Sequence, residues 1–290
     1  MRRHALCLLS LMACSSPVPP PAFPVDEAIG AFALDPSSPV IARSTDPTDP
    51  DYGGATAPTV WTDAKGYHAA YLAIDANGDT SIRGADSPDG LEWTKNGNAL
   101  VGSTPGLGRP AALGGDGGLT LYYALSDGDG GSDVLGPGGA VVVPGGDQPC
   151  VVSVSGDVWL YALVPDGSIH AYESLDGVTF SDQGEVLAVG PDGGFDSFAI
   201  GAPSAIVEQS ALGRNLFRLW YTGIDEPGGT PSIGLSGAFA GEGPFERYPE
   251  NPVRFHGDVA SVYAIDGGFA MLYSQTPLYA PTDISLATHP

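Results

Sequence analysis

Short apolar runs, separated by polar or glycine-containing turns, define a segment, Ala57–Trp93, whose pattern recurs along the chain. It contains an apolar run opened by an X-Pro step, a glycine turn, an aromatic-rich run, a polar loop and a third run. The segment ends on the motif Ser-x-Asp-Gly-x-x-Trp. Short runs bounded by turn residues, without a helical period, predict β-strands. Their recurrence predicts a fold built from repeats.

Five copies of this unit can be counted along the chain. The residues taken to open the first strand of each copy are Pro58, Pro110, Pro149, Pro203 and, in the fifth copy, Val259. The copies recur at roughly the 40–50-residue period of four-stranded propeller blades. We therefore expect an all-β fold, a five-bladed β-propeller.

A strand near the N-terminus is predicted to close the ring of blades. The fifth copy ends at Thr288, after its third strand, and so lacks a fourth. The run Phe32–Val40 aligns without a gap on Phe245–Val253, the expected fourth strand of copy four. The propeller should therefore occupy residues 31–290, with Phe32–Ile41 as the outer strand of the last blade.

The Ser-x-Asp-Gly-x-x-aromatic motif occurs twice, at Ser87–Trp93 and Ser174–Phe180, and we interpret it as structural. Asp-Gly suits a tight turn between the third and fourth strands, and the serine caps that turn. The aromatic ring is expected to pack between blades. Its distance from the Asp is one residue shorter than in the Asp-box of sialidases, which disfavours a six-bladed sialidase fold.

The N-terminus has the features of an export signal. A basic start, Met1–His4, precedes an apolar stretch, Ala5–Met12, that is too short to span a bilayer. It continues into Leu-Met-Ala-Cys14, which resembles the lipobox of bacterial lipoproteins. We expect residues 1–13 to be a cleaved signal peptide and Cys14 to carry the lipid. The alternative is an ordinary secretory signal that happens to contain Cys14.

Residues 14–30 are interpreted as the lipidated cysteine and a tether. The tether begins with a proline-rich run, 15–21, which favours an extended and semi-rigid chain. No Asp follows Cys14, and by analogy with envelope sorting this favours the outer membrane over the inner one. The protein is thus expected to be exported and attached to the membrane only through its lipid.

The charge of the chain excludes several partners. The 290 residues contain 11 Lys and Arg against 34 Asp and Glu, giving a net charge of −23. Nucleic acid requires clustered basic residues, so we expect no nucleic-acid partner. Contact with anionic lipid through a basic face is disfavoured for the same reason.

Five blades with X-Pro strands and Asp-Gly turns resemble the five-bladed propeller superfamily of glycoside hydrolase families 43, 32, 62 and 68. The resemblance implies a central funnel in which two carboxylates from the innermost strands hydrolyse a glycan. At the three family-43 positions this chain has Ala57 for the base, Ala111 for the supporting Asp and Asp147 for the Glu acid. The usual catalytic set is therefore incomplete.

Other residues of the expected funnel remain candidates for binding. Phe255–Val259 resembles the His-Gly start of blade five in family 43, which implies that His256 and Asp258 face the funnel; a loop His and an edge Asp is the alternative. Asp147 and Asp258 are weak candidates for a new acid–base pair. The full set of expected funnel residues is Arg109, Gln148, His256, Asp258, Trp61 and Tyr52, of which the last two suit sugar stacking.

Metal and cofactor signals are weak. Asp127, Asp129 and Asp133 alternate with glycines and are weak candidates for Ca²⁺, although Gly131 replaces the third ligand of an EF-hand loop. A solvated loop is the alternative, and no other cofactor is expected. A second acidic run, 46–51, precedes the first blade and is expected near the funnel mouth.

Three functions follow, in order of preference. The first is a lipoprotein whose hydrolase-like propeller binds glycan without hydrolysing it. The second is an active glycoside hydrolase with a rearranged acid–base pair. The third is a scaffold that binds a surface protein, because a propeller presents loops on two faces. A monomer is expected in each case.

Overall fold

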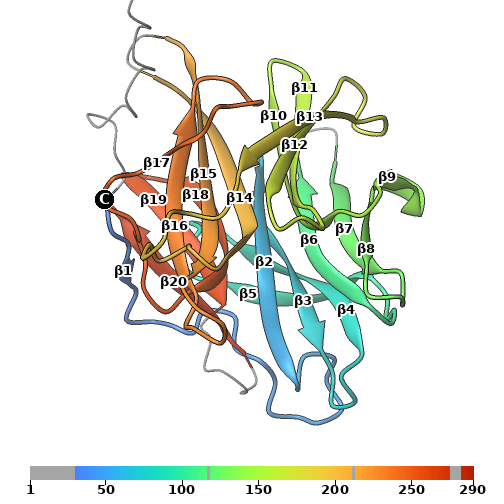
Figure 1. Ribbon diagram of the computed structural model, residues 1–290. Helices are drawn as coiled ribbons and strands as arrows, with labels where there is room; N and C mark the ends of the chain where they lie inside the picture. Colours follow the sequence, from blue (N-terminus) through green and yellow to red (C-terminus); the bar gives the residue numbers. More distant parts are fainter. Residues whose placement is uncertain (1–29, 116–117, 211–212, 275–281) are drawn as a thin grey trace, which may run out of the picture.

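The structure of the protein, a computed structural model, describes residues 30–115, 118–210, 213–274 and 282–290. These residues form five four-stranded antiparallel sheets, which follow one another around the molecule in chain order (Figure 1). The five-bladed propeller predicted from the sequence is confirmed. The signal peptide, Cys14 and most of the tether lie outside the described residues.

The blades are numbered by their innermost strands. Blade 1 consists of β2 (Gly54–Asp63), β3 (Gly66–Ile74), β4 (Thr80–Ser87) and β5 (Thr94–Val101). Blade 2 consists of β6 (Leu107–Leu113), β7 (Thr120–Ser126), β8 (Ser132–Leu135) and β9 (Val141–Val143). Blade 3 consists of β10 (Asp147–Val154), β11 (Asp157–Leu163), β12 (Ile169–Ser174) and β13 (Ser181–Leu187). Blade 4 consists of β14 (Ala199–Gln209), β15 (Asn215–Ile224), β16 (Ser232–Ala238) and β17 (Glu246–Arg247). Blade 5 consists of β18 (Asp258–Ile265), β19 (Gly268–Ser274), β20 (Ile284–His289) and β1 (Ala33–Leu34).

The N-terminal strand closes the ring as predicted. β1, near the start of the described residues, pairs with β20, the last strand of the chain, in the last sheet (Figure 1). Ser38 Oγ accepts the Leu286 N–H at 2.9 Å, and in blade 4 Asn251 Oδ1 accepts the Leu235 N–H at 2.8 Å. The matching bonds show that the two segments occupy equivalent places, as their alignment predicted. Phe32 is 3% exposed, so the closing segment is also part of the core.

Each innermost strand is interrupted by a β-bulge in its first half. The two unpaired residues are Ala57-Pro58, Gly108-Arg109, Gln148-Pro149, Ala202-Pro203 and Val259-Ala260 in blades 1 to 5. Proline is tolerated at a bulge because no ladder bond is required of it. The strands therefore begin before the prolines, not at them. The register also corrects two assignments, since Pro110 lies one residue after the expected position and Val259 one residue before it.

Side chains that follow the bulges join neighbouring blades. The acceptors, each bonded to a backbone N–H of the next blade, are Thr59 Oγ1 (Ala112, 3.2 Å), Cys150 Sγ (Ala205, 3.0 Å), Ser204 Oγ (Val262, 3.0 Å) and Ser261 Oγ (Val60, 3.0 Å). Blade 2 has Pro110 at this position, which offers no such acceptor. Four of the five blade junctions thus carry this bond.

The Asp-Gly motif has the structural role expected of it. Ser87 Oγ accepts the Gly90 N–H at 2.8 Å, and the Asp89 carboxylate accepts the next two backbone N–H groups. Trp93 then packs edge-on against Tyr263 of blade 5, with ring centroids 6.1 Å apart. The second copy of the motif packs Phe180 against Tyr122 of blade 2 in the same way, at 5.9 Å.

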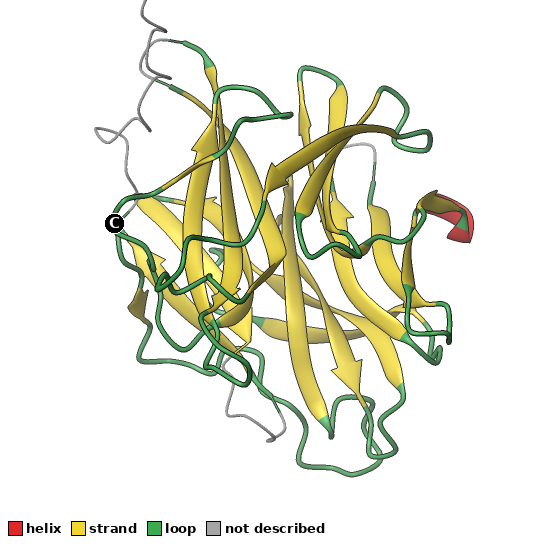
Figure 2. Cartoon of the chain, viewed as in Figure 1, coloured by secondary structure: helices red, strands yellow, loops and turns green. Residues whose placement is uncertain are grey.

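Helix is nearly absent from the described ranges. It is limited there to one short turn, η2 (Pro137–Gly139), drawn in red in Figure 2. No helix among the described residues is long and apolar enough to cross a membrane.

Candidate functional site

The starting ends of the innermost strands bring the chemically reactive side chains together at one face of the propeller. In the register, Asp147 of blade 3 and Asp258 of blade 5 both occupy the residue directly before the bulge. Thr56, Leu107 and Gly201 occupy that position in the other blades. Two acidic groups therefore stand at equivalent places around one axis.

Arg109 lies at the centre of this site. Its side chain is only 6% exposed, and Nη2 donates to the Ala260 carbonyl at 2.8 Å. Arg109 belongs to blade 2 and Ala260 to blade 5, which are not neighbours in the ring, so the side chain crosses the propeller axis. Nε and Nη1 are buried and have no hydrogen-bond partner within the described residues. The funnel floor thus carries a cation with two unused donors.

The charges near Arg109 account for its electrostatics. Burial lowers the pKa of Arg109, because the interior disfavours a charge, and the charges of Cys150, Asp258 and Asp147 oppose that shift. The charges of both carboxylates therefore stabilise the charged guanidinium. No ion pair joins it to either of them among the described residues.

Asp258 is held in one orientation and keeps one oxygen available. Its Oδ1 accepts the Thr222 hydroxyl at 2.9 Å and the Val259 N–H at 2.8 Å. Burial raises the pKa of Asp258, while those two bonds and the charge of Arg109 oppose the rise. Within the described part of the chain Oδ2 has no such bond, so it can accept from or donate to a ligand.

Asp147 and Gln148 already accept hydrogen bonds from the backbone. Asp147 Oδ1 accepts the Gln148 N–H at 2.7 Å. Gln148 Oε1 accepts the Ala202 N–H of blade 4 at 2.6 Å, which joins two blades. The Gln148 amide oxygen is thus committed to a structural bond, and its part in ligand binding stays a prediction.

The two alanines expected in place of hydrolase carboxylates line the same region. Ala57 is 5% exposed and Ala111 is 2% exposed. The Ala57 N–H is bonded to Ser274 Oγ of blade 5 at 3.1 Å. Neither position offers an acid or a base, so a hydrolytic pair would have to come from Asp147 and Asp258.

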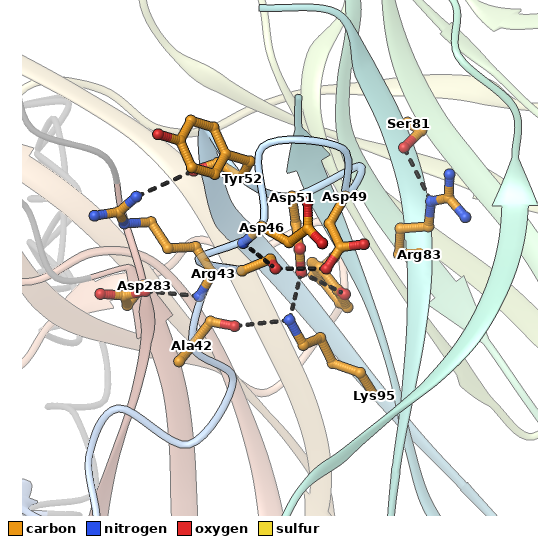
Figure 3. Close-up of polar contacts among 12 residues, drawn as sticks. Ala42, Arg43, Asp46, Asp49, Asp51, Tyr52, Ser81, Arg83, Lys95 and Asp283 are labelled. Atoms are coloured by element: carbon orange, nitrogen blue, oxygen red, sulfur yellow. Dashed lines mark hydrogen bonds and ion pairs between the residues drawn. The ribbon is translucent and has the colours of Figure 1, made fainter. Parts of the chain in front are cut away.

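The other predicted funnel residues lie at different places. Tyr52 is half-buried just before β2, and its carbonyl accepts a bond from Arg43 at 3.1 Å (Figure 3). His256 is exposed before β18, with a φ of 57°. Trp61 lies towards the far end of β2, stacked on His68 with centroids 5.4 Å apart. The structure therefore places Trp61 away from Asp258, at the opposite end of the channel.

The far end of the channel forms its own cavity of about 320 Å³. Three consecutive residues near the end of each innermost strand line it, among them Trp61, Val152 and Val262. Most of these side chains are apolar. The polar site around Arg109 lies at the starts of the innermost strands, and this apolar cavity lies near their other ends.

The acidic segment before blade 1 serves the fold. Asp51 is 3% exposed and accepts Lys95 Nζ at 2.7 Å and the Tyr71 hydroxyl at 3.3 Å, while Lys95 also donates to the Ala42 carbonyl (Figure 3). This set ties the closing segment to blade 1. Asp51 therefore has a structural role, which the sequence did not reveal.

The same clamp recurs in blade 4. Asp196 is 2% exposed and accepts Arg247 Nε at 2.8 Å and the Tyr221 hydroxyl at 2.9 Å. Arg247 also donates to the Ala188 carbonyl. Both clamps share a sequence pattern, in which an Asp lies three residues before the innermost strand and a Lys or Arg lies in the outermost strand of the same blade.

The expected calcium loop does not gather its three carboxylates. Asp127 Oδ1 accepts the N–H groups of Asp129 and Gly131, whereas Asp133 Oδ1 caps Gly145 at 2.8 Å. No group of three or more His, Cys, Asp or Glu residues in the described ranges is placed to hold a metal. The three-carboxylate calcium site is thus not formed here.

Thr222 and Ser274 were missed by the sequence reasoning. Thr222 lies two residues before the end of β15 and Ser274 is the last residue of β19, and they bond to the bulge N–H groups of the next blade, at Val259 and Ala57. The signal was present as a hydroxyl residue directly after a buried tyrosine, in Tyr221-Thr222 and Tyr273-Ser274.

Solved structures share this architecture. A structure from a study of glycoside hydrolase family 130, whose mannoside phosphorylases include hydrolases that target β-1,2-mannosidic linkages in Candida mannan, is 14% identical with a TM-score of 0.71. The match covers 91% of this chain and 94% of the chain in that structure. A thermostable family-43 glycoside hydrolase is 15% identical (TM-score 0.62; 81% of this chain, 88% of that one). A family-62 α-L-arabinofuranosidase from Podospora anserina, in complex with cellotriose, is 12% identical with a TM-score of 0.64. The match covers 90% of this chain and 97% of that one.

These likenesses concern the fold. No family model and no curated protein matches the chain. The chain is thus a five-bladed propeller structurally like glycoside hydrolases and phosphorylases of families 43, 62 and 130.

Proposed function

We propose that this protein is a lipid-anchored envelope protein whose propeller binds a carbohydrate in the funnel around Arg109 without hydrolysing it. The observation that carries the proposal is the Arg109 guanidinium, which reaches across the ring to Ala260 and whose Nε and Nη1 have no hydrogen-bond partner among the described residues, with the charges of Asp147 and Asp258 acting on it. Sugar hydroxyls both accept and donate hydrogen bonds, so one diol can use the cation and a carboxylate together. Convergent polar groups in a concavity are the usual form of a small-ligand site.

The lack of hydrolysis is supported by the residues at the hydrolase positions. Glycoside hydrolysis requires one carboxyl group as acid and another as base or nucleophile. Ala57 and Ala111 supply neither, and Asp147 already holds the Gln148 N–H. We therefore propose that this propeller binds carbohydrate but does not hydrolyse it.

A second function has one observation in its favour. Burial raises the pKa of Asp258, and a carboxyl group with a raised pKa can remain protonated and act as a general acid. Asp147 would then have to serve as base or nucleophile. This gives an active hydrolase with a rearranged pair as the alternative.

The anchoring part of the proposal rests on the sequence. The apolar stretch, the lipobox-like Leu-Met-Ala-Cys14 and the proline-rich run support a lipoprotein held away from the membrane by a tether. The outer membrane is the proposed location. A surface glycan within reach of that tether would be the ligand.

The binding part is tested with Asp258→Asn, which keeps the shape of the side chain and removes its charge. We expect the dissociation constant of a neutral oligosaccharide that binds the wild type to rise at least about tenfold in this variant. This is the effect of losing a hydrogen bond to a charged group. Leu175→Ala, at an 83% exposed residue of blade 3, is the control. Equal affinities for all three proteins would remove Asp258 from the site.

A further inference from the structure

Two exposed phenylalanines occupy the same position in neighbouring blades. Phe198 lies three residues before Gly201, and Phe255 lies three residues before Asp258. Gly201 and Asp258 are equivalent, because each directly precedes the bulge of its strand. Gly53, Thr104 and Pro144 hold the corresponding place in blades 1 to 3. An aromatic side chain at this position is therefore particular to blades 4 and 5.

Both rings are open to solvent on the funnel face. Phe198 is 52% exposed and Phe255 is 62% exposed. Each precedes the start of an innermost strand, the end of the propeller where Asp258 lies. Single exposed apolar residues are common, but two at equivalent positions of neighbouring blades, at the same end of the propeller as Asp258, indicate a binding surface.

The backbone holds both phenylalanines in place. The Phe198 N–H bonds to the Ile224 carbonyl at 2.9 Å and so continues the pairing of β14 with β15. Arg254, directly before Phe255, forms a bridge with Ile233. Preorganised contacts lower the entropy lost when a ligand binds.

Polar groups of the same two blades lie at the starts of the same innermost strands. The Thr222 hydroxyl of blade 4 donates to Asp258 of blade 5 at 2.9 Å, and Arg109 reaches the Ala260 carbonyl of blade 5 at 2.8 Å. The blade 4–blade 5 sector thus combines an apolar rim with a polar floor. A sugar ring has the matching amphipathic character, with C–H groups on its face and hydroxyls at its edge.

The charge of this sector selects among sugars. Asp147 and Asp258 both act on the Arg109 charge, Arg254 directly precedes Phe255, and the whole chain carries a net charge of −23. A uronate would add a further negative charge and would be repelled. A neutral sugar has no such cost.

We infer that Phe198 and Phe255 form a stacking platform at the funnel rim, which selects a neutral saccharide and holds its C–H face above Asp258 and Arg109. The inference deepens the proposed function and rests on it. It assigns the rim aromatics, rather than Trp61 at the far end of the channel, to sugar stacking.

The test measures binding of β-1,2-mannobiose, cellotriose, arabinotriose and trigalacturonate to the full-length protein purified in detergent. The wild type is compared with four variants. They are the double variant Phe198→Ala with Phe255→Ala (the alanine variant), the double variant Phe198→Trp with Phe255→Trp (the tryptophan variant), and the single variants Arg109→Met and Leu175→Ala. Because both phenylalanines are exposed, the alanine variant should keep the wild-type thermal midpoint. We expect it to bind the preferred neutral sugar about tenfold more weakly. The tryptophan variant should retain affinity, and Leu175→Ala should match the wild type.

The outcomes separate the inference from the proposed function. If the wild type binds and the alanine variant binds equally well, the platform is overturned and the funnel proposal stands. If the alanine variant loses binding while Arg109→Met keeps it, the phenylalanines bind the sugar but the funnel proposal, and with it the placement of the sugar above Arg109, is overturned. Tighter binding of trigalacturonate than of any neutral sugar overturns the selection for neutral sugars. If the wild type binds none of the four, both are overturned.

Discussion

Arg109 combines a high desolvation cost with incomplete bonding, and this makes it the most informative residue of the protein. A buried charge is tolerated when it is paired and fully hydrogen-bonded, and each missing bond is destabilising. Within the described residues, Arg109 has one hydrogen bond, to the Ala260 carbonyl, and its Nε and Nη1 have no partner. A residue that weakens the folded state in this way is typical of binding sites, where a ligand completes the bonding.

Replacing Arg109 by Met tests this interpretation at the residue scale. Methionine fills a similar volume without orphaned donors, so the free energy of unfolding should stay within about 1 kcal/mol of the wild type or rise. Binding of the preferred sugar should be lost. Urea denaturation and a binding titration measure the two effects. A loss of several kcal/mol with unchanged binding would instead make Arg109 a structural residue.

The Asp-Gly turns show how a local motif stabilises contacts between blades. Tyr263 of blade 5 donates its hydroxyl to the Gly90 carbonyl at 2.7 Å, and Tyr122 of blade 2 does the same at Gly177 at 2.8 Å. Each turn is thus a docking point for the neighbouring blade. The turn explains why the motif lies where two blades meet.

Gly90→Ala tests the packing of this element, with Gly97→Ala as the matched control. Both glycines have positive φ, 79° and 74°, so alanine costs each about 1 kcal/mol in the backbone. A Cβ at Gly90 would lie 3.0 Å from Ile265 and 3.1 Å from Tyr263, whereas at Gly97 it meets nothing within 4 Å. Gly90→Ala should lose about 1–3 kcal/mol more in chemical denaturation. Equal losses would contradict the docking role of the turn.

The second turn predicts an acid-dependent stability. Backbone N–H bonds from Thr179 and Val178 lower the pKa of Asp176 to about 2. The unfolded value lies near 4, so this contribution is complete above about pH 4 and disappears as the pH falls towards 2. The stability of Asp176→Asn, measured by urea denaturation from pH 5 to pH 2, should fall less steeply than that of the wild type. Parallel curves would show that the bonds do not favour the ionised form.

The elements themselves were predictable because their signals are local. Gly turns and aromatic runs located the strands, and the alignment of Phe32–Val40 on Phe245–Val253 located the closing one. The bulges were not predicted, because an X-Pro step also suits the start of a strand. That ambiguity placed Pro110 and Val259 one residue away from their equivalents.

The candidate site was less predictable than the fold because it depends on long-range geometry. Arg109, Asp147 and Asp258 were identified near the starts of the innermost strands, whereas Trp61, expected with them, lines the cavity near the other ends of these strands. Phe198 gave no signal until the register made it equivalent to Phe255. Sequence position along a strand indicates the face only when the register is known.

At the scale of the whole molecule, the ring is closed by pairing segments from both ends of the chain. β1 pairs with β20, and Lys95 of blade 1 bonds the Ala42 carbonyl of the closing segment. The funnel face contains Arg109, both carboxylates and the rim phenylalanines. In the proposed function, the tether predicted over residues 14–30 separates this domain from the membrane.

Cys14→Ser tests the proposed anchor. Without the thiol no lipid can be attached, and one acyl-bearing terminus is the membrane contact proposed for this chain. We expect the variant in the soluble fraction after cell fractionation and the wild type in the membrane fraction. Retention of Cys14→Ser in the membrane fraction would leave the export signal in place but exclude the lipobox.

The central claim, binding without hydrolysis, is tested most directly by one incubation of the wild-type protein with the oligosaccharide panel. Bound sugar and released products are measured in the same sample by calorimetry and chromatography over many hours. The account predicts saturable binding of a neutral oligosaccharide that is recovered intact. Release of shorter sugars, abolished by Asp258→Asn, or an absence of binding across the panel would contradict it.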